Sequence, residues 1–123
     1  MNIVIHRGTH QIGGSAIEIS TASTRIILDF GNELSLDEKY IPIGFDIDGV
    51  TKGTPNCDGI VISHYHMDHL GQLTSVLPEI PVYMGTLGKE VALIGAEYQD
   101  KDLYSRLLGT NTFRGGESFT IGD

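Results

Sequence analysis

The sequence predicts a single α/β domain, and three features of it carry that prediction. The first 30 residues read as three strands, two of which alternate with the period of β-strands. Residues 59–63 (Gly-Ile-Val-Ile-Ser) form a short apolar run, which is typical of a strand in a parallel sheet covered on both faces. Beyond residue 69 the apolar positions recur three and four apart, as they do in helices. Strands that alternate with helices indicate the α/β class.

Three strands are expected in the N-terminal part of the chain. Residues 2–7 are rich in β-branched side chains, and residues 15–20 and 24–30 alternate. Glycines at 13 and 14 mark a turn between the first two strands. The apolar residues that the alternation places on a common face are Ile17, Ile19, Ile26, Leu28 and Phe30.

A long loop and a short helix are expected on either side of the strand at 59–63. Prolines and glycines interrupt any period over residues 31–56, and long loops inside compact domains are often functional. Residues 69–77 carry leucines at helical spacing, and Pro78 ends that pattern.

The second half of the chain predicts one more strand, two helices and a last strand. The strand covers 81–84, and Thr86 is suited to be the N-cap of the helix that follows. The helical period breaks at 100–102, a shorter helix ends at Gly109, and residues 116–121 read as a strand. The apolar positions of the first helix, which are spaced four, three and four apart, are Leu87, Val91, Ile94 and Tyr98.

Composition excludes several classes of protein. Hydrophobic residues make up 40% of the chain, enough for a core, yet no apolar run approaches the roughly 18 residues of a membrane span. Cys57 is the single cysteine and the N-terminus does not resemble a secretory signal, so we expect a cytoplasmic protein. Eight basic against sixteen acidic residues give a net charge of −8, which disfavours electrostatic binding of nucleic acid by this chain alone.

Four metal-ligand side chains fall within residues 64–69 (His-Tyr-His-Met-Asp-His). Residues two apart in an extended chain point the same way, so His64 and His66 can chelate one ion. Where the chain turns into the helix, Asp68 and His69 can hold a second ion. Imidazole and carboxylate without thiolate suit zinc, and also iron or manganese. The alternative is a solvated loop in which Asp68 caps the helix, but capping does not explain three histidines.

These residues carry a resemblance to a known family. Residues 64–69, after Ile-Val-Ile-Ser and before Leu-Gly, resemble the metallo-β-lactamase superfamily signature, and residues 26–31 resemble that family's first motif. Segments 8–14 and 81–86 are similar to the ribonuclease J-like branch of nucleic-acid-processing hydrolases, which carry a β-CASP insertion. The resemblance covers essentially the whole chain. It implies the N-terminal half of an αββα sandwich, a mixed sheet with helices on one face.

The resemblance also implies a role for each residue. His64 and His66 would bind the first metal, and Asp68 and His69 the second, most simply two zinc ions, with manganese or iron as alternatives. Asp29 would orient the ligand loop by accepting hydrogen bonds; from the residues alone, a turn-forming role is the alternative. A metal-bound hydroxide would cleave a phosphodiester bond, and Asp68 would also act catalytically. No substrate-binding residue is predicted.

The family's remaining metal ligands are missing from this chain, because no histidine follows residue 69. We therefore expect residues 1–123 to be a partial domain that stops before those motifs and is inactive or weakly active alone. The alternative function is a non-catalytic metal-binding or scaffold half-domain. The acidic residues that could conceivably substitute, although their spacing does not recommend them, are Glu97, Asp100, Asp102 and Glu117.

Half a sandwich would leave one apolar sheet face without its partner sheet. We therefore expect a homodimer, or association with the missing half-domain; the alternative is a monomer whose late helices, around 103–108, cover the sheet. Nucleic acid is the implied partner of the longer enzyme, not of this acidic chain alone, and no membrane is expected. The residues expected to contribute to the uncovered face are Ile3, Ile5, Ile17, Ile19, Ile26, Leu28 and Phe30.

Overall fold

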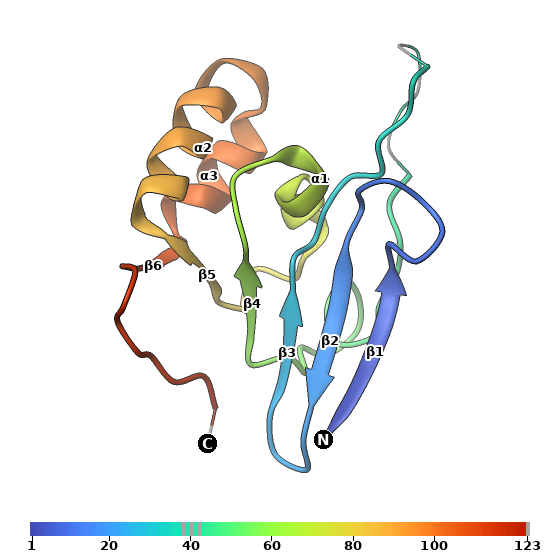
Figure 1. The fold of residues 1–123 in the computed structure, drawn as a ribbon, viewed down its shortest axis with the longest axis vertical. Coiled ribbons are helices and arrows are strands. Elements are labelled where there is room, and N and C mark those ends of the chain that lie inside the picture. The colour runs from blue at the N-terminus through green and yellow to red at the C-terminus, as the bar shows by residue number, and fades with distance from the viewer. Residues whose placement is uncertain (38, 40, 42, 123) are drawn as a thin grey trace.

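A computed structural model describes residues 1–37, 39, 41 and 43–122. They form one six-stranded sheet in the order β1-β2-β3-β4-β5-β6, with helices around one end of it (Figure 1). None of the helices in this part of the chain has the length and apolarity that a membrane span requires. The elements are β1 Asn2–Arg7, β2 Ala16–Ser20, β3 Arg25–Leu28, β4 Gly59–Ile62, α1 Met67–Leu70, a 3₁₀ turn Leu73–Ser75, β5 Val82–Gly85, α2 Thr86–Gln99, α3 Lys101–Leu108 and β6 Asn111–Phe113.

The sheet is mixed. Strands β1, β2 and β3 pair antiparallel, as short connections allow, whereas β3, β4, β5 and β6 pair parallel. The parallel strands therefore end at the same edge of the sheet, and the chain leaves that edge after β4 to enter α1 (Figure 1). This confirms the predicted α/β class and the positions of the first five strands.

One face of the sheet is covered by helices and forms the core. Ile27, Ile60 and Val82 lie opposite one another across β3, β4 and β5, and each is almost fully buried. Burying an apolar side chain of this size contributes roughly 1.5–3 kcal/mol. The helical residues buried with them in the same core are Leu70, Leu73, Ala92, Ala96, Leu103 and Leu107. Helices on one face of the sheet are thus confirmed.

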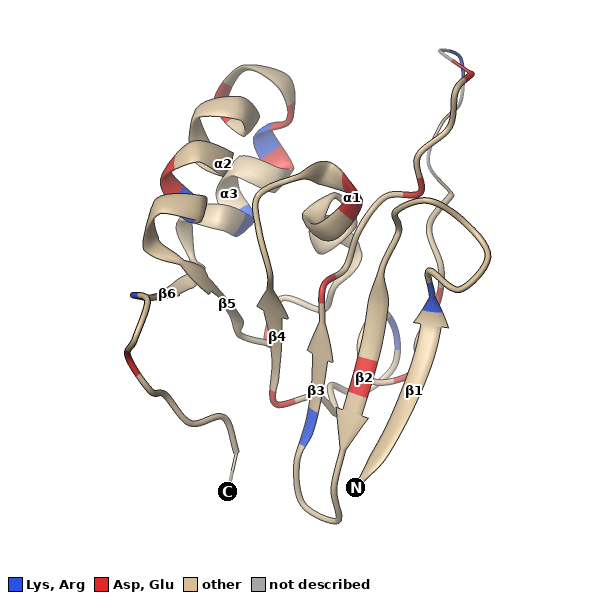
Figure 2. Cartoon of the chain, viewed as in Figure 1, with Lys and Arg blue, Asp and Glu red and all other residues tan. Residues whose placement is uncertain are grey.

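The other sheet face is apolar and open. Ile3 lies opposite Ile19, and Ile5 opposite Ile17, with Ile3 and Ile5 61% and 52% exposed. Charged residues are sparse on the strands, as Figure 2 shows. The predicted uncovered face is therefore present, with one correction. Phe30 is fully buried and stacks on Phe45 at a ring-centroid distance of 4.8 Å.

The prediction for Phe30 is wrong because the alternation ends one residue earlier. Asp29 has a φ of 60°, a left-handed conformation that turns the chain and redirects the next side chain. Late helices do not cover the open face either, since α3 buries Leu103 and Leu107 in the core on the other side. Instead the C-terminal segment reaches the open face, where Phe119 stacks on Tyr83 at 5.6 Å.

Two predicted elements differ in extent. The helix expected over 69–77 is broken into α1 and a 3₁₀ turn, because the Gln72 amide donates to the Phe30 carbonyl (2.9 Å) instead of continuing the helix. Residues 116–121 form no strand; the sixth strand, which pattern reading missed, is β6 at Asn111–Phe113. Within residues 116–121, Phe119 packs against Phe113 and Tyr83.

The predicted helix after the fifth strand is present as α2. Its large apolar residues at helical spacing are exposed, and the residues that it buries are Ala92 and Ala96. Small side chains let the helix approach the sheet closely, whereas periodicity alone shows only that one face is apolar. Gly85 rather than Thr86 is the N-cap, and the Thr86 hydroxyl donates to the Phe113 carbonyl (3.2 Å).

The described residues of the predicted loop over 31–56 form no helix or strand. Positions 38, 40 and 42, the last of which is a proline, lie outside the described residues. The second half of the loop contributes Ile47 and Val50 to the core. The loop is therefore part of the packed domain, and it contacts the covered face of the sheet.

Candidate metal centre

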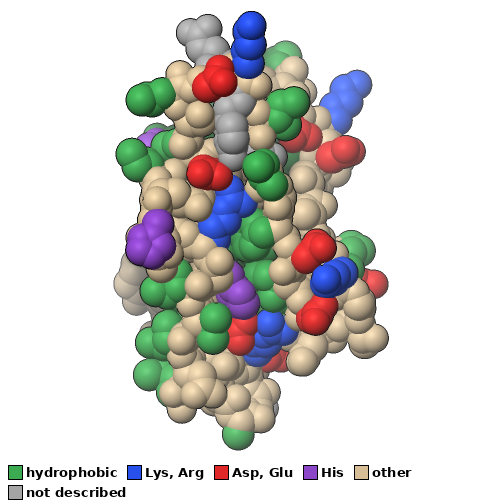
Figure 3. Space-filling view, turned by 90° about the vertical axis from the view of Figure 1, so that its right-hand side faces the viewer, with side chains coloured by type: hydrophobic (Ala, Val, Ile, Leu, Met, Phe, Trp, Pro, Cys, Tyr) green, Lys and Arg blue, Asp and Glu red, His purple; other side chains and the backbone are tan. Residues whose placement is uncertain are grey.

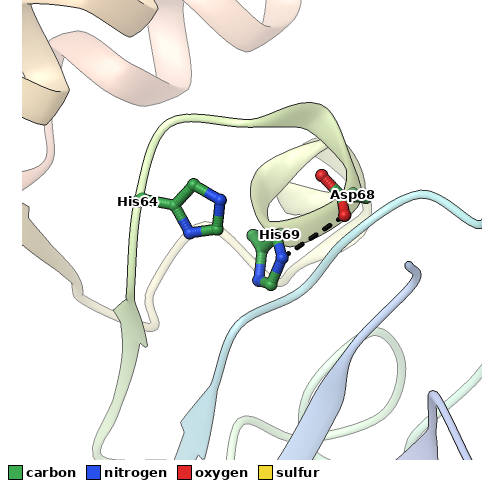
Figure 4. A group of neighbouring side chains, drawn as sticks. All are labelled: His64, Asp68 and His69. Atoms are coloured by element: carbon green, nitrogen blue, oxygen red, sulfur yellow. Dashed lines mark ion pairs between the residues drawn. The ribbon is translucent and has the colours of Figure 1, made fainter. Parts of the chain in front are cut away.

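The four predicted metal ligands lie together beyond the carboxyl end of β4. One ligand atom each of His64, Asp68 and His69 lies within 4.8 Å of the others, and their side chains point toward one another (Figure 4). His66 joins them through its Nδ1, which is 3.2 Å from the Nε2 of His64. Among the described residues this is the single cluster of its kind. The division of the four ligands into two pairs remains a prediction, since His64 lies near both.

The local backbone explains how the ligands converge. Residues 63–66 leave β4 in an irregular segment, and α1 begins at Met67 with His66 as its N-cap. Asp68 lies inside the first turn and is not the N-cap, so the capping alternative is wrong. Its Oδ2 instead lies 3.3 Å from the Nε2 of His69.

Asp29 makes the contacts that a ligand-orienting residue needs. Its buried carboxylate accepts hydrogen bonds from the backbone amide (2.7 Å) and the hydroxyl (2.9 Å) of Ser63, and lies 2.7 Å from the Nδ1 of His69. A carboxylate on one ring nitrogen fixes the imidazole and leaves the other nitrogen free for a metal. Asp29 also turns the chain through its positive φ, as the turn-forming alternative predicts, whereas its role in orienting metal ligands stays a prediction.

Ser63 is a site residue that sequence reasoning missed. Its hydroxyl lies 3.0 Å from the Nδ1 of His64 and 3.4 Å from the Nδ1 of His69, in addition to its bond to Asp29. The available signal was its position directly before the first histidine. The contacts themselves depend on β3 and β4 being neighbours, which only the fold establishes.

Backbone contacts from distant segments hold the ligand loop. The amides of Gly14, Phe30 and Asn32 donate to the carbonyls of Asp68 (3.1 Å), His69 (2.7 Å) and Met67 (2.9 Å). These approaches require glycine. A Cβ on Gly31 would overlap the Asp68 carbonyl, and one on Gly13 would lie 2.6 Å from the Asp68 Cβ. The glycines near the first strands therefore serve the candidate site.

The acidic residues weighed as substitute ligands do not join the cluster. Asp100 caps α3 by accepting from the amides of Asp102 and Leu103, and Glu117 accepts from the Arg114 amide (3.0 Å). Cys57 is half-buried, and burial raises the pKa of its thiol, which agrees with a packing role rather than a nucleophilic one.

A second polar cluster lies away from the ligand loop. The Glu18 carboxylate accepts from Arg25 (2.8 Å) and contacts His6 (2.9 Å), and Figure 3 shows a histidine, an acidic and a basic side chain adjoining on this side. The hydrogen bond from Arg25, followed by that from His6, lowers the pKa of Glu18, although burial opposes the shift. Arg25 also donates to the carbonyls of Asp48 and Asn56, so this cluster ties the long loop to the sheet.

Comparison with known proteins places the chain among ribonuclease-related sequences, although no family model matches it. It is 31% identical to "Probable RNase MJ4" of Methanocaldococcus jannaschii over 94 residues, 74% of this chain and 20% of that protein. It is 35% identical to "RNase aCSPSF2" of Saccharolobus solfataricus over 85 residues, 68% of this chain and 15% of that protein. The chain thus spans a fifth or less of the length of these relatives.

The fold has a match among solved structures. A protein of unknown function from Enterococcus faecalis superposes with a TM-score of 0.77 at 18% identity, over 98% of this chain and 35% of that chain. At this identity the match shows a shared fold.

Proposed function

The chain belongs to the β-CASP group of the metallo-β-lactamase superfamily, and from that premise we propose that it is the N-terminal part of a metal-dependent, ribonuclease J-like hydrolase of phosphodiester bonds. The observation that carries the proposal is the convergence of His64, His66, Asp68 and His69 beyond the end of β4. Relatives described as RNases support the substrate class. The second candidate function is that of a non-catalytic metal-binding half-domain. The same cluster of histidines and aspartate would then bind a metal without catalysing a reaction.

The donor set fits zinc, with manganese or iron as alternatives. Three imidazoles and one carboxylate converge, and the Nδ1 atoms of His64 and His69 are engaged by Ser63 and Asp29, which leaves Nε2 of each ring for a metal. When bound, a metal of this kind activates water and stabilises charge on the substrate. In the proposal the Asp68 carboxylate, at the start of α1, would help to hold the metal and would also accept a proton from the attacking water.

We propose further that this chain alone is inactive or weakly active. Two proteinaceous ligands for each of two ions are fewer than the three of a typical catalytic zinc site, and loosely held ions do not position reactants well. RNA binding is proposed for a longer protein, whose additional surface would offset the net charge of −8. A cytoplasmic location is part of the same proposal.

Metal content after dialysis against zinc tests the site. We expect the wild-type chain and His10→Ala, which changes an exposed histidine outside the cluster, to retain zinc. The double variant His64→Ala with His66→Ala should lose most of it. Equal, near-zero zinc occupancy in all three proteins would contradict the metal centre.

An activity assay tests the predicted weakness of this chain. RNA turnover at about 1–1,000 per second that Asp68→Ala abolishes would contradict it.

A further inference from the structure

Helix α2 carries four large apolar side chains on the outside. Leu87, Val91, Ile94 and Tyr98, here called the outer stripe, are 72%, 37%, 68% and 85% exposed. Their spacing of four, three and four is the spacing of the seam between two packed helices. A strand, with its period of two, would not match these positions. The outer stripe is therefore shaped to receive another helix.

A cavity of about 240 Å³ adjoins the outer stripe, between α2 and the ligand loop. It is lined mainly by apolar side chains, among them Tyr65, Met67 and Leu103. At Gly95 an added Cβ would meet no atom within 4 Å. Because glycine has no side chain, the helix surface is recessed at the point where the stripe meets the cavity. The cavity is smaller than the roughly 300–1,000 Å³ of small-molecule sites and suits one large apolar side chain.

The opposite edge of the outer stripe is acidic. At about 100° per residue, Glu90 and Glu97 project on the side of the stripe away from Gly95, and both are exposed. Lys89 does not neutralise this edge, because its ammonium donates to the carbonyls of Leu108 and Thr110. A second copy packed antiparallel on the stripe would place glutamate opposite glutamate, which is unfavourable. The charges therefore favour a basic occupant over a second copy.

We propose that the outer stripe and its cavity bind an amphipathic helix of another protein, with basic residues along one edge and one large apolar residue that enters the cavity. Apolar anchors at helical spacing in a groove are a common mode of peptide recognition. Tyr65 and Met67 alternate with the predicted metal ligands, so the bound helix contacts the back of the ligand loop. The partner site and the candidate metal centre thus share one segment.

Fluorescence anisotropy with designed peptides tests this proposal on the whole chain. The probe is a labelled amphipathic helical peptide with a leucine and phenylalanine seam flanked by lysines. The matched peptide carries glutamates at the flanking positions, and a third peptide has the lysine composition with a scrambled seam. We expect the lysine peptide to bind at least tenfold more tightly than either of the others.

Variants of exposed residues locate the binding. Gly95→Gln, which fills the low point, and Ile94→Asp should each weaken binding of the lysine peptide at least tenfold. Glu90→Lys with Glu97→Lys should reverse the preference in favour of the glutamate peptide. The control pair Asp46→Lys with Asp48→Lys, at exposed sites in the long loop, should leave the preference unchanged. Circular dichroism checks that each variant is folded.

Three results would overturn the proposal. The first is equal affinity for the lysine and glutamate peptides, and the second is binding that Gly95→Gln leaves unchanged in a folded protein. The third is self-association of the wild-type chain that Ile94→Asp abolishes, since it would make a second copy the occupant of the stripe.

Discussion

A single residue, Asp29, connects the sheet to the candidate metal centre. Its left-handed backbone ends the alternation of β3 and buries Phe30, and its carboxylate holds Ser63 and His69. A non-glycine residue with positive φ is uncommon, and asparagine and aspartate are among the residues that tolerate it best. The arrangement of the ligands beyond β4 therefore depends on a residue that lies far upstream in the chain.

Glu18 is a second residue of interest, because its surroundings make the stability of the fold depend on pH. It is buried, and Arg25 and His6 lower the pKa of its carboxyl below the ordinary value of 4.5. A carboxyl with a lower pKa in the folded state than in the unfolded state stabilises the fold above the unfolded-state value. That contribution is lost as the pH falls through the folded-state pKa.

We expect Glu18→Gln to lower the free energy of unfolding by about 1–3 kcal/mol at neutral pH, because a buried charge-assisted hydrogen bond is lost. The difference from the wild type should shrink as the pH falls below 4.5, where the wild-type carboxyl also becomes protonated. Urea unfolding over a series of pH values measures both effects. Glu97→Gln, at an exposed position, is the control and should change little. A Glu18→Gln difference that stays constant with pH would contradict the assignment.

At the scale of elements, the ligand loop and α1 are held by backbone contacts more than by side chains. The amides of Gly14, Phe30 and Asn32 donate to carbonyls of α1. Gly31 permits this approach, because the Asp68 carbonyl occupies the space of a side chain. The short helix α1, with four residues, has little stability of its own and depends on this support.

Gly31→Ala should therefore displace the ligand loop from β3. We expect a loss of about 1–3 kcal/mol in the free energy of unfolding, the usual cost of overpacking, and reduced zinc retention in the same variant. Gly115→Ala is the matched control, since nothing lies within 4 Å of a Cβ at that position. Equal stability and equal zinc content in the two variants would show that the approach at Gly31 is not needed.

At the scale of the whole molecule, one sheet face is buried and the other is open. The open face carries isoleucines from β1, β2 and β3, and the C-terminal segment lies against its β4–β5 side, where Phe119 stacks on Tyr83 and Ile121 lies near Gly59. Exposed apolar faces of this kind favour association, with a second copy or with a further half-domain. The outer stripe of α2 lies elsewhere on the molecule, so the two surfaces can be tested separately.

Sedimentation equilibrium should therefore show a species larger than the 13.4 kDa monomer. Ile3→Lys with Ile5→Lys, on the exposed edge strand, should shift the chain toward the monomer because charges oppose burial of the open face. Leu36→Lys, at a fully exposed leucine outside the sheet, should leave the mass unchanged. A wild-type chain that stays monomeric at high micromolar concentration and binds no hydrophobic dye would rule out association through this face.

The sequence alone determined the strands and the set of candidate ligands, because both depend on local spacing. The predicted positions of β1 to β5 agree with the structure, and the spacing of His64, His66, Asp68 and His69 predicts their convergence. The sequence also shows directly that no histidine follows residue 69. These features need no knowledge of which segments become neighbours.

Only the tertiary structure decided what each local pattern faces. The spacing of the apolar residues predicts helix α2 but not which side of it is buried, and the structure shows that the helix buries Ala92 and Ala96. Ser63 and Gly31 gain their roles through contacts with residues more than 30 positions away, which no local period encodes. The periodicity of the sequence indicates that one face of a helix or strand is apolar, or that nearby ligand side chains can converge. Packing between distant segments decides which face is buried and which atoms hold the ligands in place.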